Sequence, residues 1–437
     1  MNFVVEHVGK ILKSDIRLDG ITVIAGPNGS GKSTIGRVLM TWFSALRRLQ
    51  SRLVDERLKS AREAVDAIMK ANGLPEIGLA FTSSEESEDR LAILRSQTWF
   101  DAQKVAEHLN ELSDYFFGER DSKEDAEKIV ALRDEIGRAM NDVIGRDSTY
   151  YLPAILEDSF ETAFGEHFLG QELHVDESLM HAELSDGTRA SVRFSHGKPE
   201  SWEVVPADKI PFVFYFEPIH LLDFYANRTR QRGRPGLLLS ANGRYMAPDV
   251  DWRRFLYGDV DRSKWSVERK KKQKEIEVEL DALLDVIRGQ LEKQDRELLF
   301  VDKDVTRPVP VMNAASGIKT MAAIEKGIRA GVVQPGCILI IDEPESNLHP
   351  HWQIEFAHFL VKLSARFDMR LLLNTHSPFF LKAVEVFSRE EGCGGTAHYY
   401  HMVEYGDGLK YVTKELTDGT NEVFKTYFDA MNDLMSR

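Results

Sequence analysis

A nine-residue segment near the N-terminus, GPNGSGKST, most constrains the fold of this chain. The segment matches the pattern G-x-x-x-x-G-K-[ST] and consists of Gly26, Pro27, Asn28, Gly29, Ser30, Gly31, Lys32, Ser33 and Thr34. An apolar run over residues 21–25 precedes it, and apolar residues at helical spacing follow from Ile35 to Leu46. This order predicts a buried strand, a glycine-rich loop and an amphipathic helix, which is the context that a phosphate-binding loop requires.

The residue types of this loop fit the binding of a polyphosphate. Glycines allow backbone N–H groups to turn inward around phosphate oxygens, and the N-terminus of the following helix adds a positive dipole. We expect Lys32 to hold the β- and γ-phosphates and Ser33 to offer its hydroxyl to Mg²⁺. The alternative is a glycine-rich turn without a ligand, which the complete pattern and its context disfavour.

A second apolar run, residues 337–341, ends in two adjacent carboxylates, Asp342 and Glu343. Successive residues of a strand point to opposite sides, so the two carboxylates cannot share one role. We expect Asp342 to bind Mg²⁺, directly or through water, beside Ser33, and Glu343 to orient or activate an attacking water as a general base. Paired acids at a strand end are common by chance; the phosphate loop in the same chain favours the functional interpretation.

A third apolar run, residues 371–373, ends in the polar turn NTHSP. His376 in this turn lies where a side chain that contacts a γ-phosphate could lie; a histidine satisfied in the core is the alternative. His349 and His351 follow the acidic pair, but no third ligand occurs at useful spacing. We therefore interpret these two histidines as part of a loop rather than as a metal site.

The two ends of the chain predict one α/β core, a mixed sheet flanked by helices. Residues 1–45 and 305–437 both alternate apolar strand, loop and helix, and Lys32 and Asp342 must meet at one site. The residues between them are expected to form an insertion.

Two segments make up this insertion. Residues 46–180 predict several charged, solvated helices. Residues 181–304 predict a β-hairpin around Asp186–Gly187, a strand over 212–216 and a charged helix from Val267 to about Leu299.

Composition excludes several classes of protein. The chain has 437 residues, two cysteines, and 70 acidic against 56 basic side chains, for a formal charge of −14. No apolar run reaches the roughly 18 residues of a membrane span, and the N-terminus lacks a signal-peptide pattern, so we expect a cytoplasmic protein with no membrane partner. The negative charge argues against a surface that coats nucleic acid everywhere, although a local basic patch could still bind it.

Together, the segments GPNGSGKST, ILIIDEPESNLHP and NTHSP resemble the ABC-type ATPases over about residues 1–45 and 305–435. The similarity is to the branch shared by the chromosome-structure (SMC-like) and DNA-repair ATPases and the overcoming-lysogenization-defect (OLD) family, often described as prokaryotic AAA-family ATP-binding proteins. The resemblance implies an ABC-type P-loop core that binds ATP and Mg²⁺ and hydrolyses ATP. In its terms GPNGSGKST is the Walker A motif, Asp342 and Glu343 end the Walker B strand, and His376 is the switch histidine.

The resemblance also implies a second half-site. The residues ASGIK at 315–319 stand in the place of the family's signature motif, so Ser316, Gly317 and Lys319 are expected to contact the nucleotide bound by another copy. ATP would then be sandwiched in a homodimer or higher oligomer, and residues 346–349 would form the D-loop that touches the facing copy.

Several departures qualify this picture. The signature reads ASGIK rather than LSGGQ, which fits the OLD-like branch better than a transporter subunit. No glutamine in a persuasive context takes the place of the Q-loop residue; Gln171 and Gln231 are the candidates considered. The middle segment is too short for a long coiled coil, and the chain after His376 offers no room for the nuclease domain of OLD proteins.

These observations favour one function over two others. The leading hypothesis is an ATPase whose nucleotide-dependent dimerisation regulates a separate effector, a nuclease or toxin, in prokaryotic antiviral defence or DNA metabolism. A DNA-binding repair-type ATPase is the alternative, suggested by Arg228, Arg230, Arg232 and Arg234 and by the basic run 269–272, although solvated surfaces explain such runs equally well. A transporter ATPase subunit is disfavoured by the signature and the large insertion.

Overall fold

The computed structural model describes residues 1–72, 123–165, 177–216, 262–263, 265–283, 289–294, 297–302, 308–310, 316–406, 409–425, 432 and 435–436. The chain forms two compact units, one of Met1–Arg47 with Ser159–Arg437 and one of Arg48–Asp158. The sequence pattern placed the corresponding boundaries near residues 45 and 180. The first unit contains the phosphate loop and both other motifs.

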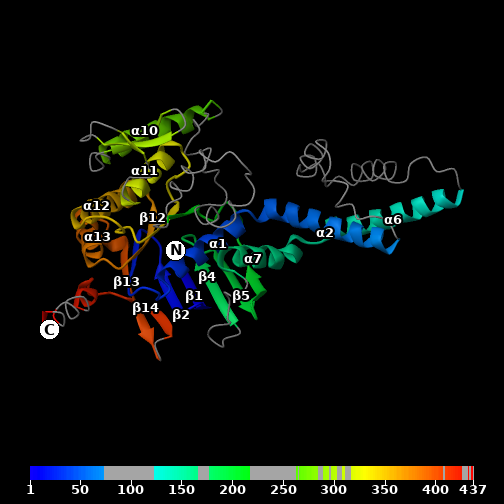
Figure 1. The fold of residues 1–437 in the computed structure, drawn as a ribbon, viewed down its shortest axis with the longest axis horizontal. Helices are drawn as coiled ribbons and strands as arrows, with labels where there is room; N and C mark the ends of the chain where they lie inside the picture. Colours follow the sequence, from blue (N-terminus) through cyan, green and yellow to red (C-terminus); the bar gives the residue numbers. More distant parts are fainter. Residues whose placement is uncertain are drawn as a thin grey trace. The chain divides into compact units, whose positions relative to one another are not determined.

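An 11-stranded mixed sheet organises the first unit (Figure 1), with the strand order β6-β5-β4-β1-β2-β14-β13-β3-β12-β11-β7. The sheet includes strands from the middle of the sequence, so this part of the chain contributes directly to the core. The strands are β1 (Asn2–Val8), β2 (Ile11–Arg17), β3 (Ile21–Ala25), β4 (Glu177–Glu183), β5 (Arg189–Ser195), β6 (Lys198–Glu203), β7 (Val213–Phe216), β11 (Ile338–Asp342), β12 (Arg370–Thr375), β13 (Ala397–Tyr405) and β14 (Lys410–Glu415).

Five neighbouring strands, β13, β3, β12, β11 and β7, run parallel. All residues of β3, β7 and β11 are buried, as expected for strands that are covered on both faces. The strand that precedes the NTHSP turn, β12, lies between the phosphate-loop strand β3 and the acidic strand β11. Because parallel strands end at the same edge, the three sequence motifs converge there.

Helices cover both faces of the parallel strands. The helices of this unit are α1 (Lys32–Arg47), the end of α7 (Ser148–Phe164), α10 (Val267–Leu283), α11 (Ser316–Arg329), α12 (Pro350–Phe367) and α13 (Pro378–Glu390), with the 3-10 helix η3 (Gly394–Thr396). Helices α11, α12 and α13 share one apolar core with Leu339 and Ile341 of β11. Ile340 lies between Leu339 and Ile341 in β11, so its side chain points to the opposite face of the sheet. Gly36 of α1 approaches Ile340, and α1 therefore packs on that face.

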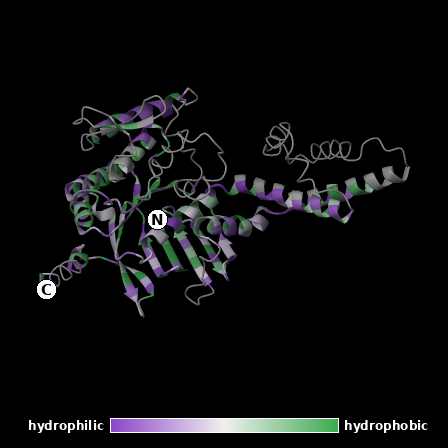
Figure 2. Ribbon diagram, in the orientation of Figure 1, coloured by the Kyte–Doolittle hydropathy of each residue, from purple (hydrophilic) through white to green (hydrophobic). Residues whose placement is uncertain are grey.

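The second unit is helical. Its described residues form α2 (Leu49–Ala71), α6 (Lys123–Gly145) and most of α7, and a buried apolar cluster joins these helices. Along α2 and α6, Figure 2 shows hydrophilic and hydrophobic residues intermixed, as expected for helices with one apolar stripe. The cluster contains Leu53, Ala61, Val65, Met69, Leu132, Ile136, Val143, Tyr151 and Ile155.

The expected hairpin and the three expected strands are confirmed, and one expected helix is partly wrong. The hairpin turn lies at Asp186–Gly187 between β4 and β5, and the three apolar runs form β3, β11 and β12. The charged helix expected to reach about Leu299 is wrong from Gly289 onward: residues 289–294 and 297–302 form β8 and β9, which pair in a three-stranded sheet with β10 (Val309–Pro310). The run LLFV at 298–301 favours a strand, and pairing in the sheet overrides helix propensity.

No helix among the described residues is both long and apolar enough to span a membrane.

The close approach of α1 to the sheet gives a test of this packing. A Cβ at Gly36 would lie 2.7 Å from Ile340 Cγ2 and 3.0 Å from the Tyr215 ring, so we expect Gly36→Ala to lower the free energy of unfolding by about 1–3 kcal/mol. Gly137→Ala is the control, because a Cβ added to this α6 glycine would meet no atom of the described residues within 4 Å, and the change should stabilise by up to about 1 kcal/mol. Urea unfolding followed by circular dichroism measures both, and equal effects would contradict the packing argument.

Candidate functional site

The phosphate loop joins β3 to α1 and depends on glycine at three positions. Gly26, Gly29 and Gly31 have φ angles of +153°, +74° and +98°, which side-chain-bearing residues rarely adopt. Gly31 is also tightly packed, since a Cβ there would lie 3.0 Å from Ile11 Cγ1. Helix α1 begins directly after it, at Lys32, so the unpaired N–H groups of the first helical turn belong to the loop. This arrangement favours the binding of an anion in the loop.

The Lys32 side chain is buried, with 6% of its surface exposed. Its ammonium donates hydrogen bonds to the carbonyl oxygens of Gly26 (2.9 Å) and Pro27 (2.7 Å). Burial lowers the pKa of Lys32, and the negative charges of Asp342, Glu343 and Glu345 act in the opposite direction. The lysine therefore lies between the loop and the acidic strand end, in the field of both.

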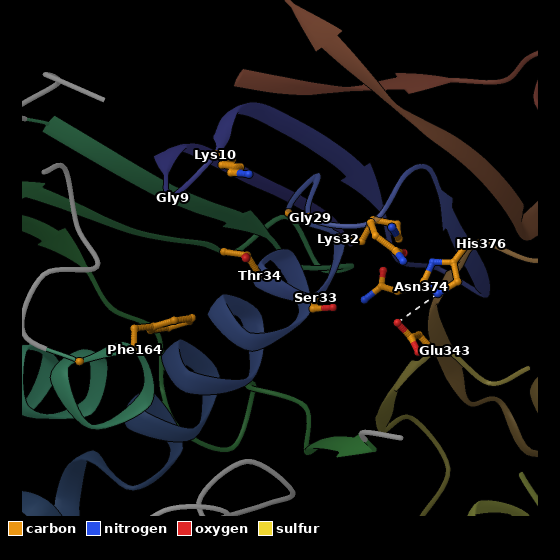
Figure 3. Close-up of a pocket in the computed structure, with 13 residues that line it drawn as sticks. Gly9, Lys10, Gly29, Lys32, Ser33, Thr34, Phe164, Glu343, Asn374 and His376 are labelled. Carbon is orange, nitrogen blue, oxygen red and sulfur yellow. Dashed lines mark ion pairs between the residues drawn. The ribbon is translucent and has the colours of Figure 1, made fainter. Parts of the chain in front are cut away.

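A cavity of about 680 Å³ opens over the loop, a size that suits a small ligand such as a nucleotide. Figure 3 shows Lys32, Ser33, Glu343, Asn374 and His376 toward one end and Lys10 and Phe164 away from them. Sequence reasoning did not identify this second group, because no motif links the β1–β2 turn or the end of α7 to the loop. The cavity is lined by Gly9, Lys10, Asn28, Gly29, Gly31, Lys32, Ser33, Thr34, Phe164, Gly165, Glu343, Asn374 and His376.

Asp342 is held by two side chains from neighbouring strands. The carboxylate is 5% exposed; the amide of Asn374 donates to its Oδ1 at 2.5 Å, and the Tyr215 hydroxyl donates to its Oδ2. The same hydroxyl lies 3.4 Å from the carbonyl oxygen of Ser33. Tyr215 thus connects the acidic strand end with the first turn of α1, and the expected metal partners Asp342 and Ser33 lie at one place.

These residues fit a magnesium ion. A serine hydroxyl and a carboxylate are the hard oxygen ligands that Mg²⁺ prefers, and nucleotide phosphates and water usually supply the rest. The Oδ1 atom of Asn374 is buried and has no hydrogen-bond partner among the described residues, so it remains available to a donor such as a metal-bound water. Within the described part of the chain, no group of three or more His, Cys, Asp or Glu side chains could hold a metal by itself.

Glu343 and His376 face one another at the edge of the cavity. Glu343 Oε1 lies 3.0 Å from His376 Nε2, and Ser346 donates to Oε2 at 2.8 Å. The Glu343 backbone has a φ of +46° and its N–H donates to the Asn374 carbonyl at 2.8 Å. Unfavourable backbone angles of this kind concentrate at functional sites. With 39% of the Glu343 side chain and 29% of the His376 side chain exposed, both are accessible from the cavity.

His349 has a structural role that agrees with the loop interpretation. Its ring is the N-cap of α12 and accepts a hydrogen bond from the His351 N–H at 3.3 Å, with Pro350 at the first helical position.

The second half-site is described only in part. Helix α11 begins at Ser316, so the segment resembling the signature lies at a helix N-terminus. The side chains of Ser316, Gly317 and Lys319 lie outside the described residues, as do Gln171, Gln231 and the arginines at 228, 230, 232 and 234. Their roles stay predictions.

Besides Lys10 and Phe164, sequence reasoning did not assign Tyr215, Asn374 and Glu345. A weak signal existed for Tyr215, which carries the only hydroxyl in the buried strand VFYF. Asn374 and Glu345 lie inside the quoted motifs, but their partners become visible only in the fold.

Tyr215 offers a test of the Asp342 network. Tyr215→Phe removes the hydroxyl that orients Asp342 while keeping the ring, so we expect Mg²⁺-dependent phosphate release from ATP to fall roughly tenfold. Tyr400→Phe is the matched control, because Tyr400 is equally buried in the same sheet but accepts its hydrogen bond from the Arg17 N–H (3.0 Å). Both variants should lose about 1 kcal/mol of stability. Equal turnover in the two variants would contradict the assignment.

Comparison with known proteins adds a family match. Residues 222–382 match the family model described as "AAA domain, putative AbiEii toxin, Type IV TA system". This range covers fewer than half of the residues but includes α11, β11 and β12, and so the acidic strand end and His376. No curated protein sequence matches the chain significantly.

Two solved structures align with nearly the whole chain at low sequence identity. The SMC head domain from Thermotoga maritima aligns with 11% identity and a TM-score of 0.37, covering 95% of this chain and 98% of that one. The SmcHead bound to the C-winged helix domain of ScpA aligns with 11% identity and a TM-score of 0.39, covering 97% and 98%.

The expected fold class and enzyme class are confirmed by the mixed α/β sheet, the phosphate loop at its edge and the family match. The chain has the α/β core of a P-loop ATPase, and its residues 222–382 are similar to the AAA-domain family model.

Proposed function

We propose that ATP binding joins two copies of this chain and that the dimer, opened again by hydrolysis, switches a separate effector protein in prokaryotic defence or DNA metabolism. The observation that carries the proposal is the cavity, which the phosphate loop, Glu343, Asn374 and His376 line. Asp342 is hydrogen-bonded to Asn374, and the described residues show no second catalytic set. The family description, which names a putative toxin, agrees with a role in defence.

The chemistry of one site follows from its contacts. The phosphates of ATP would take the place of the Gly26 and Pro27 carbonyls as partners of the Lys32 ammonium. The Glu343 carboxylate, held by Ser346 and His376, would orient the attacking water and accept its proton. Mg²⁺ held by Ser33 and Asp342 would neutralise charge on the phosphates.

A second helix N-terminus supports the proposed dimer. The N-terminus of α1 lies in the phosphate loop of the same chain. The Ser-Gly pair at 316–317 forms the N-terminus of a second helix, α11. A helix start with small residues suits a phosphate group. We place a γ-phosphate bound by a second copy there, with Ser316, Gly317 and Lys319 as its contacts.

Blocking hydrolysis tests the dimer. Glu343→Gln keeps the side-chain shape and can accept from Ser346, but it cannot take a proton, so ATP should bind without turnover. With ATP and Mg²⁺ we expect light scattering to give twice the mass of the monomer, and only monomer without nucleotide.

The control is the same variant with Lys32→Ala, which should stay monomeric because the phosphates lose their buried ammonium. A Glu343→Gln protein that binds ATP and still remains monomeric would exclude the proposed sandwich.

Direct binding to duplex DNA is the second candidate, and one observation favours it. The run 269–272 at the start of α10 consists of four basic residues, all exposed. Acidic residues at 268, 275, 277 and 279 on the same helix reduce its positive potential, so we rank this function second.

Salt dependence tests the DNA hypothesis. If the run contacts phosphates, changing Lys270, Lys271 and Lys272 to alanine should weaken duplex binding at about 50 mM salt and flatten its dependence on salt up to about 200 mM. Fluorescence anisotropy measures both. Affinity that does not respond to salt would remove the hypothesis, as would an equal loss in a control with three other exposed lysines changed, Lys59, Lys70 and Lys198.

A further inference from the structure

Glu345 is a buried carboxylate close to the cavity that the motif analysis left without a role. Its side chain is 7% exposed, although it lies only two residues after Glu343 in the loop that follows β11. We propose that Glu345 is a positioning residue that holds the His376 turn, and thereby the Glu343–His376 pair, in the geometry needed for hydrolysis. The proposal rests on the roles of Glu343 and His376 in the proposed function.

One oxygen of Glu345 organises the whole turn after β12. Its Oε1 accepts three hydrogen bonds: from the Thr375 hydroxyl at 2.7 Å, the His376 N–H at 2.8 Å and the Ser377 N–H at 3.0 Å. Hydrogen bonds to an ionised acceptor are stronger than neutral ones, and burial strengthens them further. Three consecutive residues of one turn are therefore fixed by a side chain from another loop.

His376 is held both at its backbone and at its ring. Glu345 binds the backbone N–H of the histidine, and Glu343 lies 3.0 Å from its ring Nε2. A further hydrogen bond, from the Glu343 N–H to the Asn374 carbonyl at 2.8 Å, joins the loop after β11 to the end of β12. Glu343 and Glu345 lie in the same loop after β11, and together they position the His376 ring. A displacement of Glu345 would therefore change the distance between the Glu343 carboxylate and the His376 ring.

Holding the turn by hydrogen bonds does not by itself require a charged side chain at position 345. A neutral acceptor would satisfy the same three donors, and burying a carboxylate is costly. Its second oxygen, Oε2, is buried with no hydrogen-bond partner among the described residues. The negative charge also opposes the effect of burial on the Lys32 ammonium. Glu345→Gln therefore separates the effect of the charge from that of the hydrogen bonds.

The test measures ATP turnover in the full chain. Glu345→Ala should lower kcat about 10- to 100-fold and change the KM for ATP less than about threefold, because the phosphate loop keeps its contacts. His376→Ala should give a comparable loss. The double variant should be no slower than His376→Ala alone, since both changes remove the same positioned group.

Two further variants separate positioning from stability. Glu385→Ala is the matched control: Glu385 is 3% exposed and accepts hydrogen bonds from Lys382, Arg389 and Thr420, but it does not line the cavity. It should lower the melting temperature and leave kcat unchanged. Glu345→Gln retains an acceptor for the turn without the charge, so a folded protein with intermediate kcat is expected even where Glu345→Ala does not fold.

Three outcomes would overturn the proposal. These are losses that multiply in the double variant, a kcat loss in Glu385→Ala as large as in Glu345→Ala, or full turnover in Glu345→Gln together with Glu345→Ala. Failure of the proposed function is a separate result. In that case the Glu343→Gln protein stays monomeric with ATP, while the Glu345→Ala and His376→Ala losses in kcat still do not add in the double variant. Unchanged turnover in His376→Ala would reject the positioning role along with the role of the histidine.

Discussion

The parallel pairing of β3, β12 and β11 is the constraint on which the site depends. In this register Ala25 pairs with Thr375, and Asn374 pairs with Asp342. Residues from both ends of the sequence therefore reach the same sheet edge, and the phosphate loop begins where the acidic strand ends. A slip of one residue in either pairing would turn the side chains of that strand to the other face and remove Asp342 from Asn374. The fully buried apolar strands, which cannot slip without exposing or overpacking the core, protect this register.

Strand β12 lies between β3 and β11 and contributes contacts to both carboxylates of the site. Asn374 at its end donates to Asp342, and the following turn carries His376 to Glu343. A single strand thus supplies contacts to the expected metal ligand and to the expected general base. Because Glu345 fixes the same turn, the groups on β12 and the loop after β11 form one hydrogen-bonded network rather than independent contributions. Side chains in such networks lose their effect together when one member is removed.

Sequence reasoning found the parts of the site whose chemistry is local. The glycine pattern around Lys32, the adjacent acids after an apolar run and the polar turn around His376 each have a short-range cause, and the structure brings Lys32, Glu343 and His376 to one cavity. The hydrogen bond from Tyr215 to Asp342 could not be read in the same way, because it depends on which strand lies beside β11. Strand pairing also determined the structure of residues 289–294 and 297–302, where the charged pattern predicted a helix and the chain forms strands. Spacing along the chain carries no information about such partners.

The loop after β11 connects the cavity to the rest of the core. It begins with Glu343, whose φ of +46° costs on the order of 1–3 kcal/mol, and it ends at His349, whose ring caps α12. The hydrogen bonds of Glu343 and Glu345 to the His376 turn offset that cost, so the conformation of the loop depends on contacts inside the site. Loss of a γ-phosphate would alter those contacts, and the change would reach the first turn of α12 through only five intervening residues, 344–348. A switch of this kind requires a rigid element beyond the loop, and α12, with seven buried residues packed in the apolar core, provides one.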